Sequence, residues 1–361
     1  MRIIAVTGAS GGHIFPALAF LEALRCSQPG VRTLLVLPEG GFSGSLDTRG
    51  QPFRYIPISG MTARMRRNPA AAAWQACIGC ARSIEIIVRF KPDLVVGFGS
   101  LASVPVVLCA WLFRVPTMIH EQNVIPGRAN LFLSRFVDRV AVSFEESRAL
   151  FPHPDRAVLT GNPLRSRMRP MAKDEARRAM GLLPDVFTVL VTGGSQGSSS
   201  INRACMQAFA DPALKGRIQV IHITGKGAGD AAAKAYSSCG ITSRVVPFLE
   251  EMETAYSASD IAICRGGATT CAELAFFALP ALIVPYPYAQ AHQSRNAAAL
   301  ESKGLCRVVS DSELDGGKVK DFVNSCLDEP GFLAAMKAAF KTPGREEARA
   351  RLAAAAMGVE R

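Results

Sequence analysis

The hydrophobic positions of this chain alternate between short apolar runs and longer helical patterns. Strand-length runs occur early, as in Arg2 to Val6 and Leu94 to Gly97, and again in the second half, as in Thr188 to Thr192 and Ile261 to Cys264. Between the runs, apolar residues recur at the i, i+3, i+4, i+7 spacing of a helix face. Repeated strand and helix segments predict parallel, doubly wound sheets of the α/β class.

The strand and helix pattern occurs twice. Its periodicity lapses from Arg165 to Lys173, and a chain of 361 residues is too long for one ordinary core. We therefore expect two Rossmann-like units that face each other across a cleft. The first should span residues 1–163 and the second residues 164–340, and a helix within residues 341–361 should pack back on the first.

Three loops of the second half follow predicted apolar strands. They carry Gly193 to Gly197, Gly266 to Glu273 and His292-Gln293. Because the carboxyl ends of parallel strands share one edge, these loops should converge. The free N–H groups at a helix start favour an anion, and Glu273, about one turn in, could accept hydrogen bonds from neighbouring sugar hydroxyls. The pattern favours a nucleotide; the alternative is an ordinary turn with Glu273 solvated.

The first half has one glycine loop, Gly8 to Gly12, which ends in His13. A near-neutral imidazole there could take a proton from an alcohol. The alternative is that His13 only caps the helix or binds phosphate. A second polar group, His120 to Asn123, lies at the carboxyl end of another predicted strand, Thr117 to His120, and its His120-Glu121 pair is a further acid/base candidate.

Composition narrows the class of partner. The net charge is +11, which favours an anionic partner, but 7% aromatic residues and the lack of a basic helix argue against nucleic acid. No Asp-x-Asp pair is present to hold a metal on a diphosphate. The longest apolar run, Leu101 to Phe113, is too short to span a bilayer, so we expect no integral membrane segment.

A basic segment precedes one apolar helix. Arg64, Arg66 and Arg67 lie just ahead of the helix that Pro69 opens and that carries Trp74. This pattern indicates either a solvated loop beside a core helix or a face that docks on anionic lipid.

Six motifs, spread in one order along nearly the whole chain, resemble those of the MurG family. The members of that family are N-acetylglucosaminyltransferases of the GT-B fold. The motifs are Gly8 to Ala17, His120 to Asn123, Gly161 to Arg165, Gly193 to Gly197, Arg265 to Glu273 and His292 to Ala297. The resemblance implies an inverting transfer of N-acetylglucosamine from UDP-N-acetylglucosamine to the C4 hydroxyl of the muramoyl unit of lipid I, an undecaprenyl-diphosphate muramoyl-peptide. It implies no metal or other cofactor.

The resemblance also implies where the enzyme works and which residues act. A peripheral enzyme on the cytoplasmic face of the inner membrane is expected, with other cell-wall synthesis proteins as further partners. His13 is the expected base, with Glu121 in reserve. The expected substrate-binding residues are Ser10, Gly11, Gly12, Asn123, Arg165, Ser195, Leu249, Ala268, Thr269, Thr270, Glu273, His292 and Gln293. Among them, Leu249 would recognise uracil, Glu273 the ribose and Gln293 the sugar hydroxyls.

The chain departs from the family pattern at two places in the first half. Ser10 stands where threonine is usual, which keeps a hydroxyl, and Gly99 to Pro105 lacks a usual tyrosine and one glycine. We therefore assign no acceptor contact to that loop. Two other functions stay open at this point: a UDP-N-acetylglucosamine 2-epimerase of the same architecture, and a nucleotide-sugar-binding scaffold without turnover.

Overall fold

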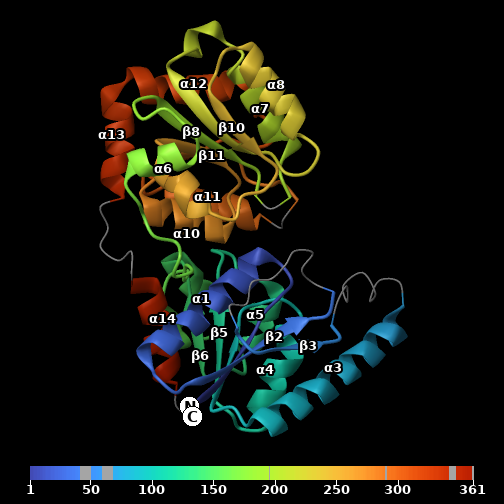
Figure 1. The fold of residues 1–361 in the computed structure, drawn as a ribbon. Coiled ribbons are helices and arrows are strands. Elements are labelled where there is room, and N and C mark those ends of the chain that lie inside the picture. The colour runs from blue at the N-terminus through green and yellow to red at the C-terminus, as the bar shows by residue number, and fades with distance from the viewer. Residues whose placement is uncertain (41–49, 59–67, 195, 289–290, 341–346, 360–361) are drawn as a thin grey trace. The chain divides into compact units, whose positions relative to one another are not determined.

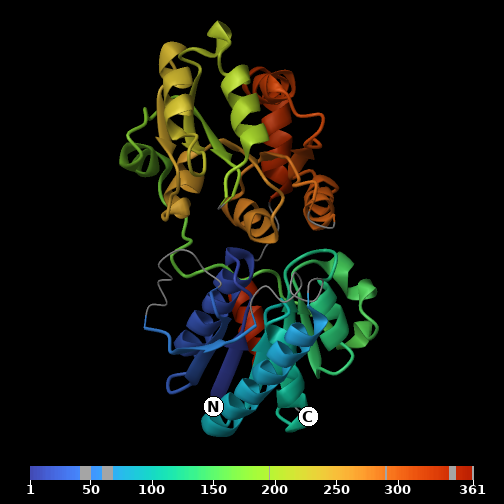
Figure 2. The same ribbon diagram turned by 90° about the vertical axis from the view of Figure 1, so that its right-hand side faces the viewer.

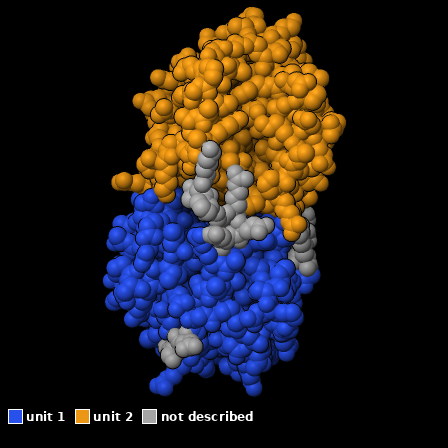
Figure 3. Space-filling model, turned by 90° about the vertical axis from the view of Figure 1, so that its left-hand side faces the viewer, with its two compact units in different colours: residues 1–166, 344–361 blue, residues 167–343 orange. Residues whose placement is uncertain are grey.

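The chain forms two compact units in a computed structural model, which describes residues 1–40, 50–58, 68–194, 196–288, 291–340 and 347–359. Unit 1 comprises residues 1–166 and 344–361, and unit 2 comprises residues 167–343 (Figures 1 and 3). Each unit is described by itself. Ser195 and the basic residues Arg64, Arg66 and Arg67 lie outside the described residues.

Unit 1 is built on a seven-stranded parallel sheet with the order β3-β2-β1-β4-β5-β6-β7. Its strands are β1 (Arg2–Val6), β2 (Arg32–Pro38), β3 (Phe53–Ile56), β4 (Leu94–Gly97), β5 (Thr117–Glu121), β6 (Arg139–Val142) and β7 (Ala157–Leu159). Its helices are α1 (Gly11–Ser27), α3 (Pro69–Phe90), α4 (Ser103–Leu112), α5 (Arg128–Leu133) and α14 (Glu347–Met357), with 3-10 turns η1 (Glu145–Leu150) and η2 (Pro154–Arg156).

Both faces of this sheet are buried because successive strand residues point to opposite sides. In β1, Ile3 and Ala5 pack with α1 and α14, whereas Ile4 and Val6 pack with α3, α4 and α5. This two-sided burial explains why the strands are continuous apolar runs and not alternating ones. Helices on both faces make the unit doubly wound.

The terminal helix α14 belongs to unit 1 although it follows unit 2 in the chain. Leu352, Ala353 and Ala356 are buried in the core that α1 provides, and Arg139 donates to the carbonyl of Ala355 at 2.8 Å. The helices α1 and α14 lie side by side in both ribbon views (Figures 1 and 2). Small residues on α14 allow this close approach.

Unit 2 is built on a six-stranded parallel sheet with the order β10-β9-β8-β11-β12-β13. Its strands are β8 (Phe187–Thr192), β9 (Ile218–Ile223), β10 (Ser243–Val246), β11 (Ile261–Cys264), β12 (Ala281–Ile283) and β13 (Cys306–Val308). Its helices are α6 (Lys173–Ala179), α7 (Ser199–Ala208), α8 (Gly229–Ser238), α9 (Met252–Ala258), α10 (Ala268–Phe277), α11 (His292–Glu301), α12 (Gly316–Asp328) and α13 (Pro330–Ala339), with the 3-10 turn η3 (Pro212–Leu214).

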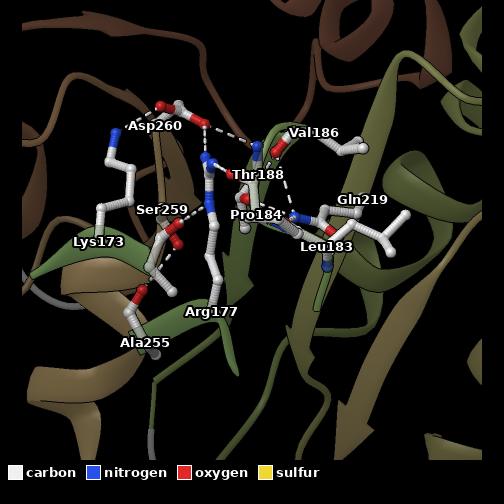
Figure 4. Close-up of polar contacts among 11 residues, drawn as sticks. Lys173, Arg177, Leu183, Pro184, Val186, Thr188, Gln219, Ala255, Ser259 and Asp260 are labelled. Carbon is white, nitrogen blue, oxygen red and sulfur yellow. Dashed lines mark hydrogen bonds and ion pairs between the residues drawn. The ribbon is translucent and has the colours of Figure 1, made fainter. Parts of the chain in front are cut away.

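A buried ion cluster fastens α6 to the sheet of unit 2 (Figure 4). The carboxylate of Asp260 accepts from Lys173 Nζ and Arg177 Nη2, both at 2.6 Å, and from the backbone N–H of Thr188 at 2.8 Å. Arg177 also donates to the carbonyls of Ala258 and Pro184. Since Arg177 and Asp260 are both buried, each needs the other to offset its desolvation.

The predicted fold class is confirmed in both units, which are parallel and doubly wound. The strand assignments differ from the sequence prediction only by one or two residues at their ends. One of these differences affects the chemistry. We expected the strand that begins at Thr117 to end at His120, but β5 continues through Glu121, whose side chain is then buried.

Candidate functional site

Each sheet has one point where the strand order reverses, and ligands of doubly wound sheets bind outside the carboxyl ends of the strands there. In unit 1 this point lies between β1 and β4, and the loop carrying His13 follows β1. In unit 2 it lies between β8 and β11, which are followed by Gly193 to Gly197 and by Arg265 to Gly267. The glycine loops predicted from the sequence therefore occupy both switch points.

His13 lies in the first turn of α1 and is enclosed by the backbone of two glycines. A Cβ at Gly8 would come within 2.9 Å of Nδ1, and a Cβ at Gly99 within 3.3 Å of Nε2. Gly99 also has φ of +86°, a conformation that favours glycine. Ser10, the residue before α1, lies with its Oγ 2.9 Å from Nδ1 of His13. The serine that replaces the usual threonine thus orients the imidazole.

Burial lowers the pKa of His13 from 6.5 to about 4. The ring is therefore neutral at pH 7, and the nitrogen that does not carry the proton can accept one. If Nδ1–H donates to Ser10, that nitrogen is Nε2. Gly11 and Gly12 at the start of α1 leave their N–H groups available for an anion, as at any helix start.

Glu121 holds a loop together. Its Oε1 accepts from the backbone and side-chain nitrogens of Asn123 at 2.9 and 3.2 Å. Its Oε2 accepts from the backbone of Gly127 and from Asn130 Nδ2, both at 2.9 Å. With four donors on one carboxylate and 1% exposure, Glu121 positions Asn123 and has no oxygen left without a donor to take a proton.

His120 is a core residue. Its Nε2 lies 3.1 Å from the carbonyl of Gly161, and its Nδ1 lies 3.1 Å from Nε2 of Gln122. Burial lowers the pKa of His120 to about 4, so the ring is neutral, with Nε2 as donor and Nδ1 as acceptor. Of the four polar residues that end this segment, only Asn123 is partly exposed.

Arg165 places a positive charge beside the first turns of α1. Its guanidinium lies over the ring of Phe15, with Cζ 4.1 Å from the ring centroid. Phe15 follows His13 by two residues on α1, so the aromatic contact fixes the arginine beside the same helix start. A positive charge and free N–H groups at one helix end suit a phosphate or diphosphate.

In unit 2, the start of α10 has the features of an anion site. Gly267 caps the helix without a side-chain hydrogen bond, and the first N–H paired back to Gly267 is that of Cys271. The N–H groups of Ala268, Thr269 and Thr270 therefore have no partner inside the helix. Among the described residues, the hydroxyl of Thr269 is buried without a hydrogen-bond partner.

Arg265 ties together the loops around that helix start. Its Nη1 pairs with Asp311 at 2.5 Å and donates to the carbonyl of Val284, and its Nη2 donates to Ser198 Oγ at 2.7 Å and to Ser200 Oγ at 3.1 Å. These partners follow β8, β12 and β13, and Arg265 itself follows β11. One guanidinium thus joins the ends of four strands, which brings the predicted loops together within the unit.

The start of α11 packs against the glycine turn after β11. A Cβ at Gly266 would come within 2.7 Å of the carbonyl oxygen of Gln293, so only glycine fits there. Oε1 of Gln293 accepts from the backbone N–H of Tyr286 at 2.9 Å, which orients the amide nitrogen as the group left for a ligand. His292 is the first residue of α11, and Leu249 lies after β10; both are partly exposed.

Glu273 lies one and a half turns into α10, and its Oε2 accepts from the hydroxyl of Tyr256 at 2.8 Å. Neither Tyr256 nor the partners of Arg265 stood out in the sequence. Tyr256 is one apolar-face residue of a short helix, and the Arg265 contacts join loops far apart in the chain. Among the described residues, no group of three or more His, Cys, Asp or Glu is arranged to hold a metal ion.

Comparison with known proteins agrees with this geometry. Residues 3–142 match the glycosyltransferase family 28 N-terminal domain, and residues 188–352 match its C-terminal domain. The UDP-N-acetylglucosamine--N-acetylmuramyl-(pentapeptide) pyrophosphoryl-undecaprenol N-acetylglucosamine transferase of Halalkalibacterium halodurans is 36% identical over 95% of both chains. The chain belongs to the MurG family. The resemblance drawn from the six motifs is thereby confirmed.

Solved structures agree with the family assignment. MurG of Acinetobacter baumannii has a TM-score of 0.79 and 26% identity to this chain and covers 99% of both chains. A UDP-GlcNAc 2-epimerase from Neisseria meningitidis bound to UDP-GlcNAc has a TM-score of 0.69 at 12% identity, covering 99% of this chain and all of its own. At that identity the likeness shows a shared fold alone, so the epimerase alternative is not favoured over membership of the MurG family.

Proposed function

We propose that this chain transfers N-acetylglucosamine from UDP-N-acetylglucosamine to the C4 hydroxyl of the muramoyl unit of lipid I, which gives lipid II in peptidoglycan synthesis. The observation that carries this function is the full-length relationship to the MurG family, with glycine loops at both sheet switch points. The enzyme is a hexosyltransferase.

The residues suggest how the bond is exchanged. The acceptor oxygen attacks the anomeric carbon as the bond from that carbon to the diphosphate oxygen breaks, and UDP leaves with the electron pair. Attack from the opposite side inverts the centre to a β linkage. His13, whose free nitrogen is neutral at pH 7, takes the hydroxyl proton, with Ser10 orienting the ring.

We propose the donor site in unit 2. The N–H groups of Ala268, Thr269 and Thr270 would receive the diphosphate, and a charge that develops on UDP would be stabilised there without a metal ion. Glu273 would bind the ribose hydroxyls, Gln293 and His292 the sugar, and the backbone at Leu249 the uracil. Ser195 is proposed for the same site from its motif alone, because it lies outside the described residues.

We propose that unit 1 carries the acceptor site. Gly11 and Gly12 have N–H groups at a helix start that suit the lipid diphosphate, and Arg165, which matches a residue that contacts the UDP-sugar, would bind the donor. Asn123, which Glu121 orients through two hydrogen bonds, would bind the transferred sugar or its donor nucleotide. Both roles rest on the geometry within unit 1.

A docking face on α3 would bring the enzyme to its lipid substrate on the cytoplasmic face of the inner membrane. Trp74, Ile78, Ile84 and Val88 are exposed on α3, with Arg82 and Arg89 beside them. By length and composition alone, residues 70–90 could also span a membrane. The opposite face of α3 packs on α4 in unit 1, which supports a peripheral location (Figure 2). Other cell-wall synthesis proteins would meet the enzyme at this membrane.

One assay tests the function: release of UDP from UDP-N-acetylglucosamine with a short-chain lipid I analogue, with and without a chelator. We expect turnover that depends on the acceptor and is unchanged by the chelator. Turnover without acceptor would instead indicate hydrolysis or isomerisation, and loss of turnover with chelator would contradict the metal-independent mechanism. Binding without turnover would indicate a scaffold.

A further inference from the structure

The proposed ribose ligand, Glu273, is held by a residue that the reaction scheme does not use. A glutamate side chain has three rotatable bonds and needs a fixed partner to present its carboxylate in one orientation. The hydroxyl of Tyr256 donates to Oε2 of Glu273 at 2.8 Å. A hydrogen bond to a carboxylate is among the stronger ones in proteins.

Tyr256 is itself rigidly placed. It lies on α9, is 3% exposed, and its ring stacks on Phe277 with centroids 5.1 Å apart and planes 26° apart. Phe277 ends the same helix, α10, that carries Glu273. The two contacts therefore fix the tyrosine against α10 at two points, one aromatic and one polar.

The tyrosine also keeps its proton. Burial, and next the charge of Glu273, raise the pKa of Tyr256 well above its ordinary value. At any pH in the working range, Tyr256 is a donor to the carboxylate and not a second negative charge beside it.

We infer that Tyr256 is a positioning residue for the donor nucleotide: by holding Oε2 of Glu273, it turns the carboxylate so that it can accept from the ribose hydroxyls, and so sets the preference for ribose over 2′-deoxyribose. This inference rests on the proposed role of Glu273. A purely structural tyrosine would contribute to the stability of α9 and α10 but would not alter which sugar the site prefers.

The test compares UDP with 2′-deoxy-UDP by calorimetry on the full chain. The unmodified protein should bind UDP about tenfold more tightly than 2′-deoxy-UDP, because the deoxy compound leaves the carboxylate of Glu273 without one of its hydrogen-bond donors. Tyr256→Phe keeps the ring and its stacking on Phe277 but removes the donor. This variant should bind UDP about tenfold more weakly and 2′-deoxy-UDP only slightly more weakly. The ratio of the two dissociation constants should then be close to one.

A matched control is available in the same unit. Tyr236 is 1% exposed, and its hydroxyl lies 2.7 Å from Nδ1 of His222. Tyr236→Phe removes one buried hydroxyl in the same way, so it should lower stability but leave the UDP to 2′-deoxy-UDP ratio as in the unmodified protein. A similar fall in the ratio for both variants would mean a general loosening of unit 2, and the inference would be wrong.

Two further measurements complete the test. In turnover, Tyr256→Phe should raise KM for UDP-N-acetylglucosamine about tenfold and leave kcat within about twofold, since it acts on binding. When it is combined with Glu273→Gln, Tyr256→Phe should raise KM almost no further, because both changes remove the same interaction. Full additivity would overturn the inference.

A second variant, Tyr256→His, keeps the test decisive if Tyr256→Phe folds poorly. Tyr256→His offers a ring N–H toward Glu273 and should retain more of the preference for UDP than Tyr256→Phe. An unchanged preference in every folded Tyr256 variant overturns the inference but leaves the proposed function intact. Failure of the unmodified protein to bind UDP at all would instead contradict the proposed function.

Discussion

At the scale of single residues, the histidines differ in how many of their ring nitrogens are hydrogen-bonded inside the protein. His120 and His222 are buried with both ring nitrogens engaged, the latter between Tyr236 and Asn202. His13 differs because Nδ1 lies beside Ser10 Oγ, while Nε2 lies beside Gly99, which has no side chain to cover it. Glycine at positions 8 and 99 therefore makes room for the imidazole of His13, the proposed base, as well as for the turn.

The role of His13 can be tested by its pH dependence. His13→Gln should lower kcat by about 10² to 10⁴ and leave KM for UDP-N-acetylglucosamine nearly unchanged, because the residue acts on the proton and not on the donor. Since the pKa of His13 is lowered to about 4, the unmodified enzyme should keep a flat kcat/KM as pH falls through 6.5.

The control for this prediction is Ser10→Ala, which removes the contact to Nδ1 but leaves the imidazole. It should reduce kcat less than His13→Gln does. Near-normal turnover of His13→Gln would reject the assignment, whereas an acidic limb near pH 6.5 in the unmodified enzyme would contradict the lowered pKa of His13 and leave its role as base open.

The sequence predicted some of these residues and could not predict others. Ser10, His13 and Glu273 stood in local motifs after β1 and β11, the strands beside the two switch points, and Gln293 stood in a motif after β12. The buried role of Glu121 was not visible, because its four donors come from a loop that folds back on it. The partner of Glu273 was equally hidden, since Tyr256 lies seventeen residues earlier on another helix.

At the scale of elements, α3 has one face that packs on unit 1 and one face that is exposed and apolar. One face is buried: Ala72, Gln75, Gly79, Ser83 and Ile87 face unit 1, and a Cβ at Gly79 would clash with Ile58. The other face exposes a group of apolar side chains, which is unusual for a helix that faces water. The sequence left open whether this helix only packs on the core or also docks on a lipid surface. Its exposed apolar face supports the proposal that it docks on lipid.

The docking role of α3 predicts a selective effect of one charge. Trp74 is 69% exposed, so Trp74→Glu should not disturb the core, but it should weaken binding to vesicles with anionic lipid about tenfold or more. Turnover with a short-chain soluble acceptor should stay the same. Sedimentation with vesicles at several salt concentrations measures the effect.

Leu183 supplies the matched control for that experiment. It is 51% exposed in unit 2, so Leu183→Glu introduces the same charge at an exposed apolar position away from α3. Vesicle binding should be unchanged in this variant. Equal loss in both variants, or binding that ignores both salt and anionic lipid, would remove α3 as the docking face.

At the scale of the whole molecule, each unit depends on contacts that the linear order of the chain conceals. The α/β pattern predicted two doubly wound sheets, because two-sided burial leaves continuous apolar strands in the sequence. We expected a helix within residues 341–361 to pack on the first unit, but the pattern could not show that Leu352, Ala353 and Ala356 are the residues that complete its core, since an alanine-rich helix offers many similar faces. Nor could it show the ion cluster of Asp260, whose partners are up to 87 residues away.

The buried histidines of both units predict how stability changes with pH. Burial lowers the pKa of His120 and of His222 to about 4, whereas an unfolded histidine titrates near 6.5. The unfolded chain therefore binds more protons in this range. The stabilisation is complete above pH 6.5 and is lost as pH falls toward 4, by up to about 3 kcal/mol for each residue.

The measurement is the free energy of unfolding in urea at intervals from pH 7.5 to 5, where ordinary carboxyl groups remain mostly ionised and the histidines dominate the slope. His222→Gln keeps a hydrogen-bonding side chain between Tyr236 and Asn202 but cannot titrate, so its stability should fall less steeply with pH. The exposed His153 gives the control, because His153→Gln removes a histidine that folding does not bury and should keep the full slope. If stability is flat across this range, or if both variants change the slope equally, the buried histidines are not what makes the fold sensitive to acid.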